Sequence, residues 1–323
     1  MNHSLGIMPF KDFWMNCYFN MYFSILISKE PSYRLAAFLN DYQYSIYESE
    51  TVRKTRFNGL MLNSMVNFHH QYLEEMVSNR APINFKEDEK FSEYLKDLVR
   101  KNEVIFVGVD LYYWVPNSVC WNNYHWYHYS LINGFDEDKK VFYVLDDNQS
   151  GFDEHAIPEE RFCTAIRNST LNPHGFINKL PGDIGKFSFS ISDVRTNAVR
   201  LAGELELMGH DMLWQMSDED FDNRDRCDLF SMYLYQIVNR QKATQVLFQI
   251  LQDKNEINSI ESSNLMHYAA DLENGWAIVR KELVRTYFSD NRAFRISEIN
   301  EKCKKLFLKE YKMWNKFLSC TTA

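Results

Sequence analysis

Hydrophobic and polar positions follow a helical period in the first hundred residues of this 323-residue chain. Apolar residues recur every three to four positions over 17–28 and, as Phe91, Leu95, Leu98 and Val99, over 87–101, which predicts two helices. A further helix is expected over 32–40, and the pattern between these segments is mixed. The region from residue 17 to about 100 is therefore predicted to be mostly helical.

The period then changes to that of strands. Residues 104–109 (VIFVGV) form a short apolar run typical of a buried strand. Residues 128–135 alternate toward a turn-like Asn133–Gly134 pair, and residues 140–145 (KVFYVL) complete a hairpin around the polar loop 136–139. Pro158 is well placed to begin a helix over 159–166.

A concentration of proline and glycine over 168–190 is typical of a domain boundary. We expect a first domain at 1–175 and an α-helical second domain at 176–323. The predicted fold class is α+β, in which N-terminal helices and an antiparallel sheet precede a helical bundle. The bundle is expected to contain four long amphipathic segments, over 194–216, 229–253, 262–288 and 296–317.

Composition narrows the classes of protein that this chain can represent. A content of 45% hydrophobic and 25% charged residues is that of a globular protein. The formal net charge of −8, without a cationic stripe, argues against nucleic-acid binding. The longest apolar run, 18–27, is interrupted by Asn20 and Ser24, so no membrane span is expected. The N-terminus lacks the pattern of a signal peptide, and six scattered cysteines favour free thiols in a reducing cytoplasm, with no metal site.

Cys17 stands at the start of the apolar helical segment NCYFNMYFSILIS. A thiol in the first turn of a helix lies near the positive end of the macrodipole and near backbone N–H groups, which favour a thiolate and can donate to an oxyanion. Most intracellular cysteines are simply buried apolar residues, and an isolated Cys17 would be interpreted in that way. A nucleophile becomes the better hypothesis because partners follow it in the chain.

Those partners are a histidine and an aspartate on the predicted hairpin. His128 begins the strand HYSLI and can act as a base or an ion-pair partner for a thiolate. His125 is the alternative, but in an extended segment the two rings project to opposite faces, and His128 is preferred. A zinc pair of the two is disfavoured because no suitable further ligand is near. Asp146 or Asp147 can orient the imidazole, although paired aspartates after a strand also form turns.

The run VIFVGVDLYYWVPNSVCWNNYHWYHYSLINGFDEDKKVFYVLDD resembles the central signature of butirosin H N-terminal-type proteins, relatives of papain-like and C39 peptidases. The resemblance covers about residues 10–170. It implies a papain-like cysteine protease fold. It also implies an enzyme that forms amides by acyl transfer, as in thiotemplated antibiotic assembly such as that of closthioamide. An acyl or peptidyl carrier protein would present the acyl chain on phosphopantetheine, an amine or diamine would accept it, and no bound cofactor is expected.

Carried over by position, Cys17 would be the acyl-accepting nucleophile, His128 the base and Asp146 its orienter. The residues assigned to the substrate cleft are Asp110, Tyr112, Tyr113 and Trp126. The chain departs from the papain-like pattern at Lys11, where a glutamine usually helps to hold the oxyanion. Lys11, Asn16 or the Cys17 backbone could serve instead, and Asp147 stands where the family commonly has proline.

Two alternatives use the same residues. A cysteine peptidase or thioester hydrolase would share the Cys17, His128 and Asp146 site, and a non-catalytic binding protein could retain the scaffold alone. The aromatic residues around His128 fit either a long apolar or aryl acyl chain or an ordinary core. His210 and His267, on the predicted C-terminal helices, are interpreted as structural.

Overall fold

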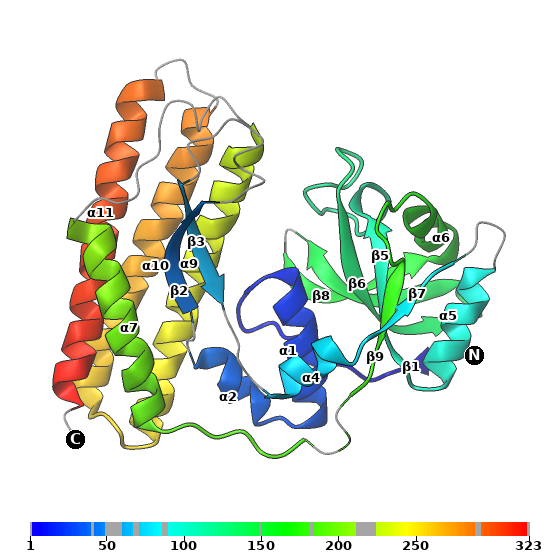
Figure 1. Ribbon diagram of the computed structural model, residues 1–323, viewed down its shortest axis with the longest axis horizontal. Coiled ribbons are helices and arrows are strands. Elements are labelled where there is room, and N and C mark those ends of the chain that lie inside the picture. Colours follow the sequence, from blue (N-terminus) through cyan, green and yellow to red (C-terminus); the bar gives the residue numbers. More distant parts are fainter. Residues whose placement is uncertain are drawn as a thin grey trace. The chain divides into compact units, whose positions relative to one another are not determined.

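The computed structural model describes residues 2–39, 42–48, 60–66, 71–85, 90–148, 150–180, 182, 184–210, 224–287 and 292–321. The chain divides into two compact units, one formed by 1–34 with 68–187 and the other by 35–67 with 188–323. Helices and an antiparallel sheet make up the first unit, and the C-terminal helices belong to the second (Figure 1). The mixed composition of helix and antiparallel sheet was predicted correctly.

The first unit is built on a seven-stranded antiparallel sheet, counted over the described residues. Its strands follow the order β4-β9-β5-β6-β7-β8, and β1 pairs with β6. The bounds are β1 (Asn2–Ser4), β4 (Ala81–Ile83), β5 (Val104–Asp110), β6 (Tyr127–Asp136), β7 (Val141–Asn148), β8 (Gly151–Pro158) and β9 (Gly175–Asn178). β5 is an apolar run (VIFVGV) that is buried along its whole length, as expected of a central strand with both faces covered.

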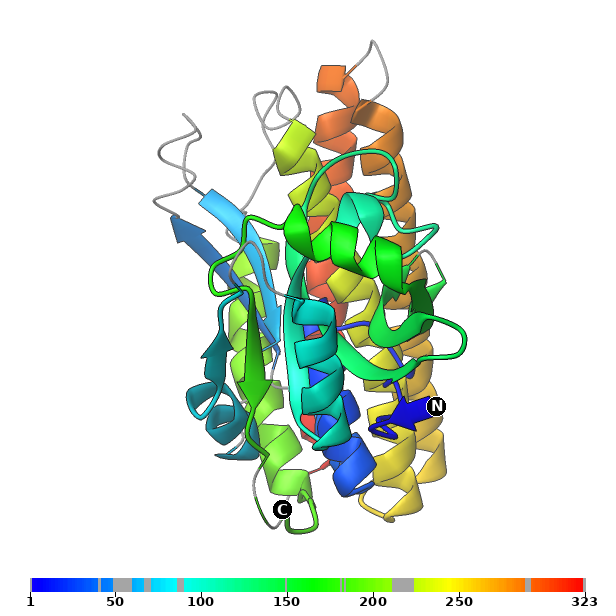
Figure 2. The same cartoon turned by 90° about the vertical axis from the view of Figure 1, so that its right-hand side faces the viewer.

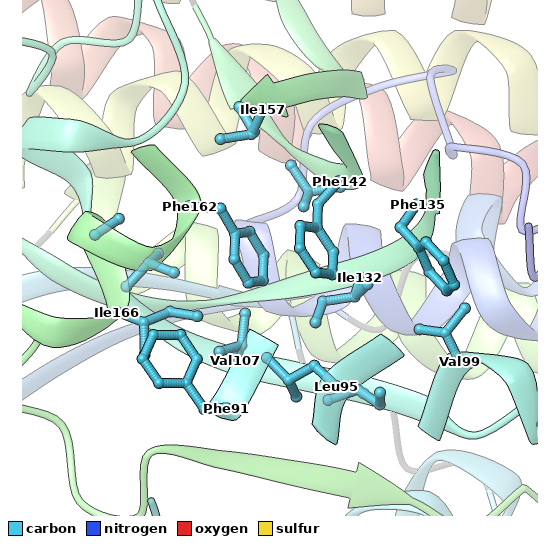
Figure 3. Close-up of a cluster of buried hydrophobic side chains, with 14 of the residues drawn as sticks. Phe91, Leu95, Val99, Val107, Ile132, Phe135, Phe142, Ile157, Phe162 and Ile166 are labelled. Atoms are coloured by element: carbon cyan, nitrogen blue, oxygen red, sulfur yellow. The ribbon is translucent and has the colours of Figure 1, made fainter. Parts of the chain in front are cut away.

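Helices lie on both faces of this sheet. Alternate residues of β5, Ile105, Val107 and Val109, join a buried cluster with α5 (Phe91–Arg100) and α6 (Glu159–Arg167). Phe142 and Phe162 stack within this cluster at a ring separation of 3.9 Å (Figure 3). The first unit also contains α1 (Cys17–Lys29), α4 (Gln71–Ser78) and the short helix η1 (Leu111–Tyr113).

The opposite face of β5 meets α1. Phe106 alternates along β5 with Ile105 and Val107, which belong to the buried cluster. Its ring lies on the other face of the strand, 5.0 Å from the ring of Tyr22 in α1. The Tyr22 hydroxyl donates to Asn178 Oδ1 of β9 at 3.0 Å. Period-two alternation along β5 therefore separates the α1 side of the sheet from the α5 and α6 side.

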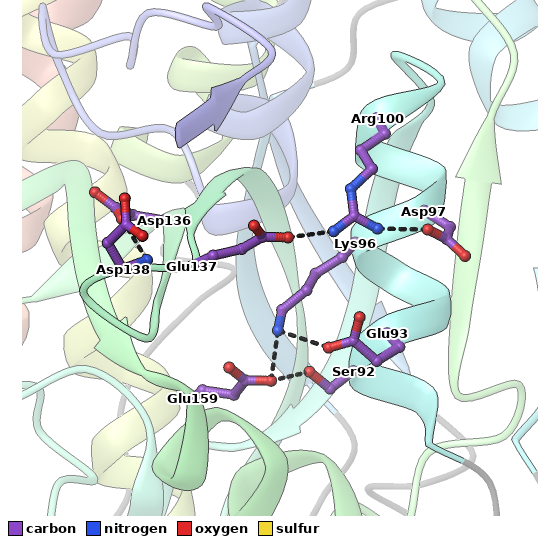
Figure 4. A network of polar contacts seen from close by, with 9 residues as sticks. All are labelled: Ser92, Glu93, Lys96, Asp97, Arg100, Asp136, Glu137, Asp138 and Glu159. Carbon is purple, nitrogen blue, oxygen red and sulfur yellow. Dashed lines mark hydrogen bonds and ion pairs between the residues drawn. The ribbon is translucent and has the colours of Figure 1, made fainter. Parts of the chain in front are cut away.

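A polar network fastens α5 to the edge of this core (Figure 4). Lys96, whose side chain is 8% exposed, contacts Glu93 and Glu159, each at 2.8 Å. Burial alone would lower the pKa of Lys96, but the two glutamates reverse this and raise the pKa. Arg100 joins Asp97 to Glu137 in the β6–β7 turn. A buried ammonium is thus compensated where α5 and α6 meet.

The second unit combines long helices with a hairpin. Its elements are the hairpin of β2 (Tyr42–Glu48) and β3 (Leu60–Val66), and the helices α7 (Ile191–His210), α9 (Arg224–Asp253), α10 (Ser259–Tyr287) and α11 (Arg292–Cys320). The four helices run side by side, which Figures 1 and 2 show from two directions. The hairpin contacts α7 and α9. Helix α2 (Tyr33–Phe38) crosses the boundary between the units.

The division of the chain differs from the expected domains 1–175 and 176–323. Residues 35–67 belong to the helical unit because the β2–β3 hairpin packs on its helices, and the boundary lies between Phe187 and Ser188. The hairpin occupies the mixed region after residue 40, so the prediction of a mostly helical segment up to residue 100 was wrong there. Residues 87–89 of one predicted helix and 211–216 of another lie outside the described residues.

The Asn133–Gly134 pair also differs from expectation, because it lies inside β6 and not in a turn. The β6–β7 register shifts between Ile132 and Gly134, and Gly134 pairs with Ser4 of β1. The strands β1, β4, β8 and β9 were also not predicted. Three of them, β1, β4 and β9, have four residues or fewer, and β9 lies in the stretch rich in proline and glycine. Within the described ranges, no helix is both long and apolar enough to cross a membrane.

Close backbone approach between β5 and β9 predicts that Gly175→Ala destabilises the first unit. An added Cβ would lie 2.6 Å from the Phe106 carbonyl oxygen, and both strands would have to shift. We expect a loss of about 1–3 kcal/mol in the free energy of unfolding, measured by urea titration. In the control Gly182→Ala, no described atom lies within 4 Å of the new Cβ. Equal losses in the two variants would contradict this explanation.

Candidate active site

Cys17 is the first residue of α1, where the sequence predicted it. The preceding Asn16 is the N-cap, and its Oδ1 accepts a hydrogen bond from the Phe19 N–H at 2.7 Å. Asn16 O also accepts the Asn20 N–H at 3.0 Å. The first N–H groups of a helix have no acceptor within it, so the amides of Cys17 and Tyr18 are the candidate donors to an anion at this end.

The segment before Cys17 is fastened by buried amides. Asn20, one turn into α1, accepts from the Met15 N–H at 2.9 Å and donates to the carbonyls of Phe10 and Phe13, both at 3.2 Å. At the bulge of β6, Asn133 forms a two-way pair with the backbone of Ile7, with both distances 3.0 Å. The position of the thiol is therefore fixed by contacts to both the helix and the sheet.

His128 and Asp146 meet on adjacent strands. The His128 Nε2 lies 2.9 Å from Asp146 Oδ2, and the side chains are 17% and 2% exposed. Asp146 also accepts the Trp114 indole N–H at 2.7 Å and the Asp147 backbone N–H at 2.7 Å. With Nε2 engaged by the carboxylate, Nδ1 is the ring nitrogen left to exchange a proton with Cys17.

The charges of this group support one another. Burial lowers the pKa of His128, but the Asp146 carboxylate and the contact with the Cys17 sulfur together raise it well above its usual range. Burial would raise the pKa of Asp146, and the charge and hydrogen bond of His128 hold it below its ordinary value instead. The geometry thus favours an imidazolium between the Cys17 sulfur and the Asp146 carboxylate.

Asp147, the other carboxylate proposed from the sequence, has a different neighbour. Its Oδ2 accepts the indole N–H of Trp14 at 2.9 Å, which links β7 to the segment before Cys17. Burial and the charge of Asp146 raise the pKa of Asp147 to about 7. Of the two aspartates, Asp146 is the one that contacts His128, as ranked from the sequence.

Lys11 forms an ion pair with the edge strand β8. Its ammonium lies 2.6 Å from Asp153 of β8 in a pair about half exposed on both sides. Burial would raise the pKa of Asp153, but the hydrogen bond and charge of Lys11 and the Glu154 backbone N–H together hold that pKa below its ordinary value. The two side-chain candidates for the oxyanion therefore have different neighbours, with Asn16 next to Cys17 and Lys11 paired with the edge strand β8.

The residues predicted to shape a cleft gather around His125. The His125 Nδ1 lies 2.6 Å from the buried Asp110 Oδ2, and its ring stacks on Tyr112 at 4.6 Å. Tyr113 lies 6.0 Å from the same ring, and Trp126 is 61% exposed. His125 precedes β6 and forms a second imidazole–carboxylate pair with Asp110.

The remaining cysteines and histidines have less to contribute to the site. Among the described residues, no group of three or more His, Cys, Asp or Glu side chains could hold a metal ion. His267 is 79% exposed and lies 3.8 Å from Asp271, and the side chain of His210 lies outside the described residues. Burial raises the pKa of Cys120, Cys163 and Cys320, and that of Cys303 to about 12.

Sequence reasoning missed the side chains that support the site. Trp114, one of the aromatic residues that precede His128 in the chain, is fully buried and donates to Asp146. Asn20 interrupts an otherwise apolar helix segment, and a buried amide in such a place is a detectable signal of a structural hydrogen-bonding role. The link between Trp14 and Asp147 joins residues 133 positions apart and leaves no local pattern.

The contact with His128 predicts selective alkylation of Cys17. Because the pKa of His128 is raised, its ring stays protonated at pH 6.5 beside the sulfur, and a thiolate paired with an imidazolium reacts readily. Brief treatment with iodoacetamide should modify Cys17 before the other five cysteines, as followed by peptide mass spectrometry. His128→Gln should slow the reaction about tenfold or more. Equal labelling of Cys320 would count against the pairing.

Asp147 predicts an unusual dependence of stability on pH. A carboxyl with a folded pKa of about 7 and an ordinary unfolded pKa favours folding while it is protonated, and this contribution falls as pH rises from about 4 to about 7. Asp147→Asn, which keeps an acceptor for Trp14, should exceed the wild type in unfolding free energy by on the order of 2 kcal/mol at pH 8 and match it at pH 4. A constant difference in urea titrations would refute this assignment.

Comparison of the chain with models of known protein families and with curated proteins finds no match. The resemblance to butirosin H N-terminal-type proteins therefore rests on the residues quoted above.

Proposed function

We propose that the chain is a papain-like cysteine acyltransferase that moves an acyl chain from a carrier-protein thioester onto an amine. The observation that carries this proposal is the Cys17 sulfur at a helix N-terminus, in contact with an imidazole that a buried aspartate holds. The chain order of cysteine, histidine and aspartate supports the papain-like assignment, as does the packing of α1 against the antiparallel sheet.

In the first half-reaction, the Cys17 thiolate attacks the thioester carbonyl of an acyl chain borne on phosphopantetheine. A bond forms between Sγ and the acyl carbon, the bond to the carrier sulfur breaks, and the carrier thiolate takes the proton from His128 Nδ1. The N–H groups of Cys17 and Tyr18 are placed to donate to the oxyanion. Thioester exchange is nearly balanced in energy, so this step stores the acyl chain on Cys17.

In the second half-reaction, an amine attacks the acyl carbon and the bond to Cys17 Sγ breaks. The nitrogen loses a proton to His128, and Asp146 stabilises the imidazolium that forms. Amide formation makes the sequence favourable overall. Competition with water is the central difficulty of this reaction, because water is abundant and would release a free acid.

Aromatic side chains near the site support an apolar or aryl acyl group. Tyr112 and Tyr113 are partly exposed beside His125, and Trp126 is exposed by 61%. An exposed indole of this size is available for contact with an apolar ligand. Trp114 is excluded from this role because it is buried against Asp146. The net charge of −8 is compatible with a cationic amine as acceptor.

The proposal predicts an acyl adduct on Cys17. Octanoyl and benzoyl thioesters of pantetheine are incubated with the protein, and the intact mass is followed before and after addition of propylamine. We expect an acyl mass increment that is discharged as the propylamide. Cys17→Ala should give no adduct, and His128→Gln should acylate at least about 100-fold more slowly. Cys320→Ala, in the helical unit, should behave as the wild type.

The other outcomes separate the alternatives. Release of free acid at the same rate with and without propylamine would replace acyl transfer by thioester hydrolysis. An adduct that persists in Cys17→Ala would remove the nucleophile assignment. Absence of any adduct, from pantetheine thioesters or from acyl carrier protein loaded with the same acyl groups, would leave a binding protein on this scaffold.

A further inference from the structure

A second imidazole–carboxylate pair lies at the same end of the sheet as the first. The β5–β6 register places Asp110 opposite Tyr127 and Val109 opposite His128. His125 comes two residues before Tyr127 and pairs with Asp110 at 2.6 Å. Both pairs therefore stand where β5 ends and β6 begins.

The two pairs also share a neighbour. Burial raises the pKa of the Cys120 thiol, and the charges of His128, Asp110 and Asp146 all act on it as well. Cys120 therefore lies within electrostatic range of His128 and of both carboxylates, Asp110 and Asp146.

The second pair is built to hold its ring in one orientation. Asp110 is 1% exposed, its Oδ2 contacts His125 Nδ1, and its Oδ1 accepts the Tyr112 N–H at 3.1 Å. The Tyr112 ring lies almost parallel to the imidazole, with 14° between the planes. The N–H of Leu111 donates to Trp126 O at 2.8 Å and fixes the backbone on the other side. A surface histidine without a function does not need a buried carboxylate.

Pairing through Nδ1 leaves the second ring nitrogen of His125, Nε2, for contact with a ligand. When Nδ1–H donates to Asp110, the neutral imidazole carries its lone pair on Nε2. The His125 side chain is 53% exposed, whereas that of His128 is 17% exposed. The outer ring can therefore meet a ligand before it reaches the inner one.

We propose that His125, with Asp110, takes a proton from the ammonium form of the acceptor and so delivers a free primary alkylamine to the acyl group on Cys17. This inference rests on the proposed acyltransferase function. An alkylamine is almost wholly protonated at pH 7, like a lysine side chain, and an ammonium has no lone pair for attack. His128 is paired with Asp146 and serves the proton released during attack, so it is not available for this earlier transfer.

The proposed reaction contains two proton transfers, one before the attack of the amine and one during it. The ammonium N–H bond breaks and a bond forms between the proton and His125 Nε2, leaving a neutral amine and an imidazolium paired with Asp110. The amine lone pair then forms the bond to the acyl carbon, the carbon–sulfur bond to Cys17 breaks, and His128 takes the second proton. The carboxylates of Asp110 and Asp146 compensate the two imidazolium charges, and Tyr112 stacks on the face of the His125 ring.

The experiment separates acylation of Cys17 from its discharge by two amines of different basicity. The enzyme is first acylated with octanoyl-pantetheine, and the adduct is measured by intact mass. It is then mixed with propylamine, which is protonated at pH 7, or with hydroxylamine, which is neutral. His125→Gln should acylate as the wild type, discharge to propylamine about tenfold to 100-fold more slowly at pH 7, and discharge to hydroxylamine at the wild-type rate. The propylamine defect should shrink as pH rises.

Two further variants complete the design. Asp110→Asn should give the same pattern, and His267→Gln, an exposed histidine of the helical unit, should show no defect. If His125→Gln discharges to both amines at the wild-type rate, the inference is overturned while the acyl-enzyme stands. Equal slowing with both amines would make the role purely structural and would also overturn it. If the wild type forms no adduct, the proposed function fails first. Should Asp110→Asn not fold, the comparison of amines in His125→Gln decides alone.

Discussion

A single buried carboxylate organises the first unit. Asp146 is 2% exposed at its side chain, and an ionised carboxylate in such a place is costly unless donors surround it. Those donors come from three places: the imidazole of β6, the indole of Trp114 after η1, and the next backbone amide of β7. The loop after β5 and the strands β6 and β7 are thereby held together at the point where His128 meets Cys17.

The neighbouring Asp147 shows the cost of that arrangement. Two adjacent carboxyl groups cannot both ionise easily in a buried setting, and the second has its pKa raised to about 7. The same residue links Trp14 to β7 and so helps to position the segment that carries Cys17. The geometry of the candidate site and the stability of the fold are therefore coupled through one pair of aspartates.

Local patterns predicted most of the elements that carry the site. A polar cap followed by an apolar run placed Cys17 at a helix start, and alternation with a polar loop placed His128 and Asp146 on adjoining strands. What could not be predicted depends on partners far away in the chain. The Asn133–Gly134 pair has the chemistry of a turn, yet β1 and the Ile7 backbone use it as a bulge. The β2–β3 hairpin packs on helices that are distant in the sequence. The partner of His125 is Asp110, fifteen positions earlier.

The assignment of residues 35–67 to the helical unit has a consequence for the order of assembly during synthesis. Cys17 and its helix are synthesised first, followed by the β2–β3 hairpin and then by the strands with His128 and Asp146. The helices on which the hairpin packs, α7 and α9, begin only at residues 191 and 224. The hairpin must therefore wait without its helical partners while residues 68–187 of the first unit are translated. Neither unit is one uninterrupted stretch of sequence, so cutting the chain at a single point cannot release both intact.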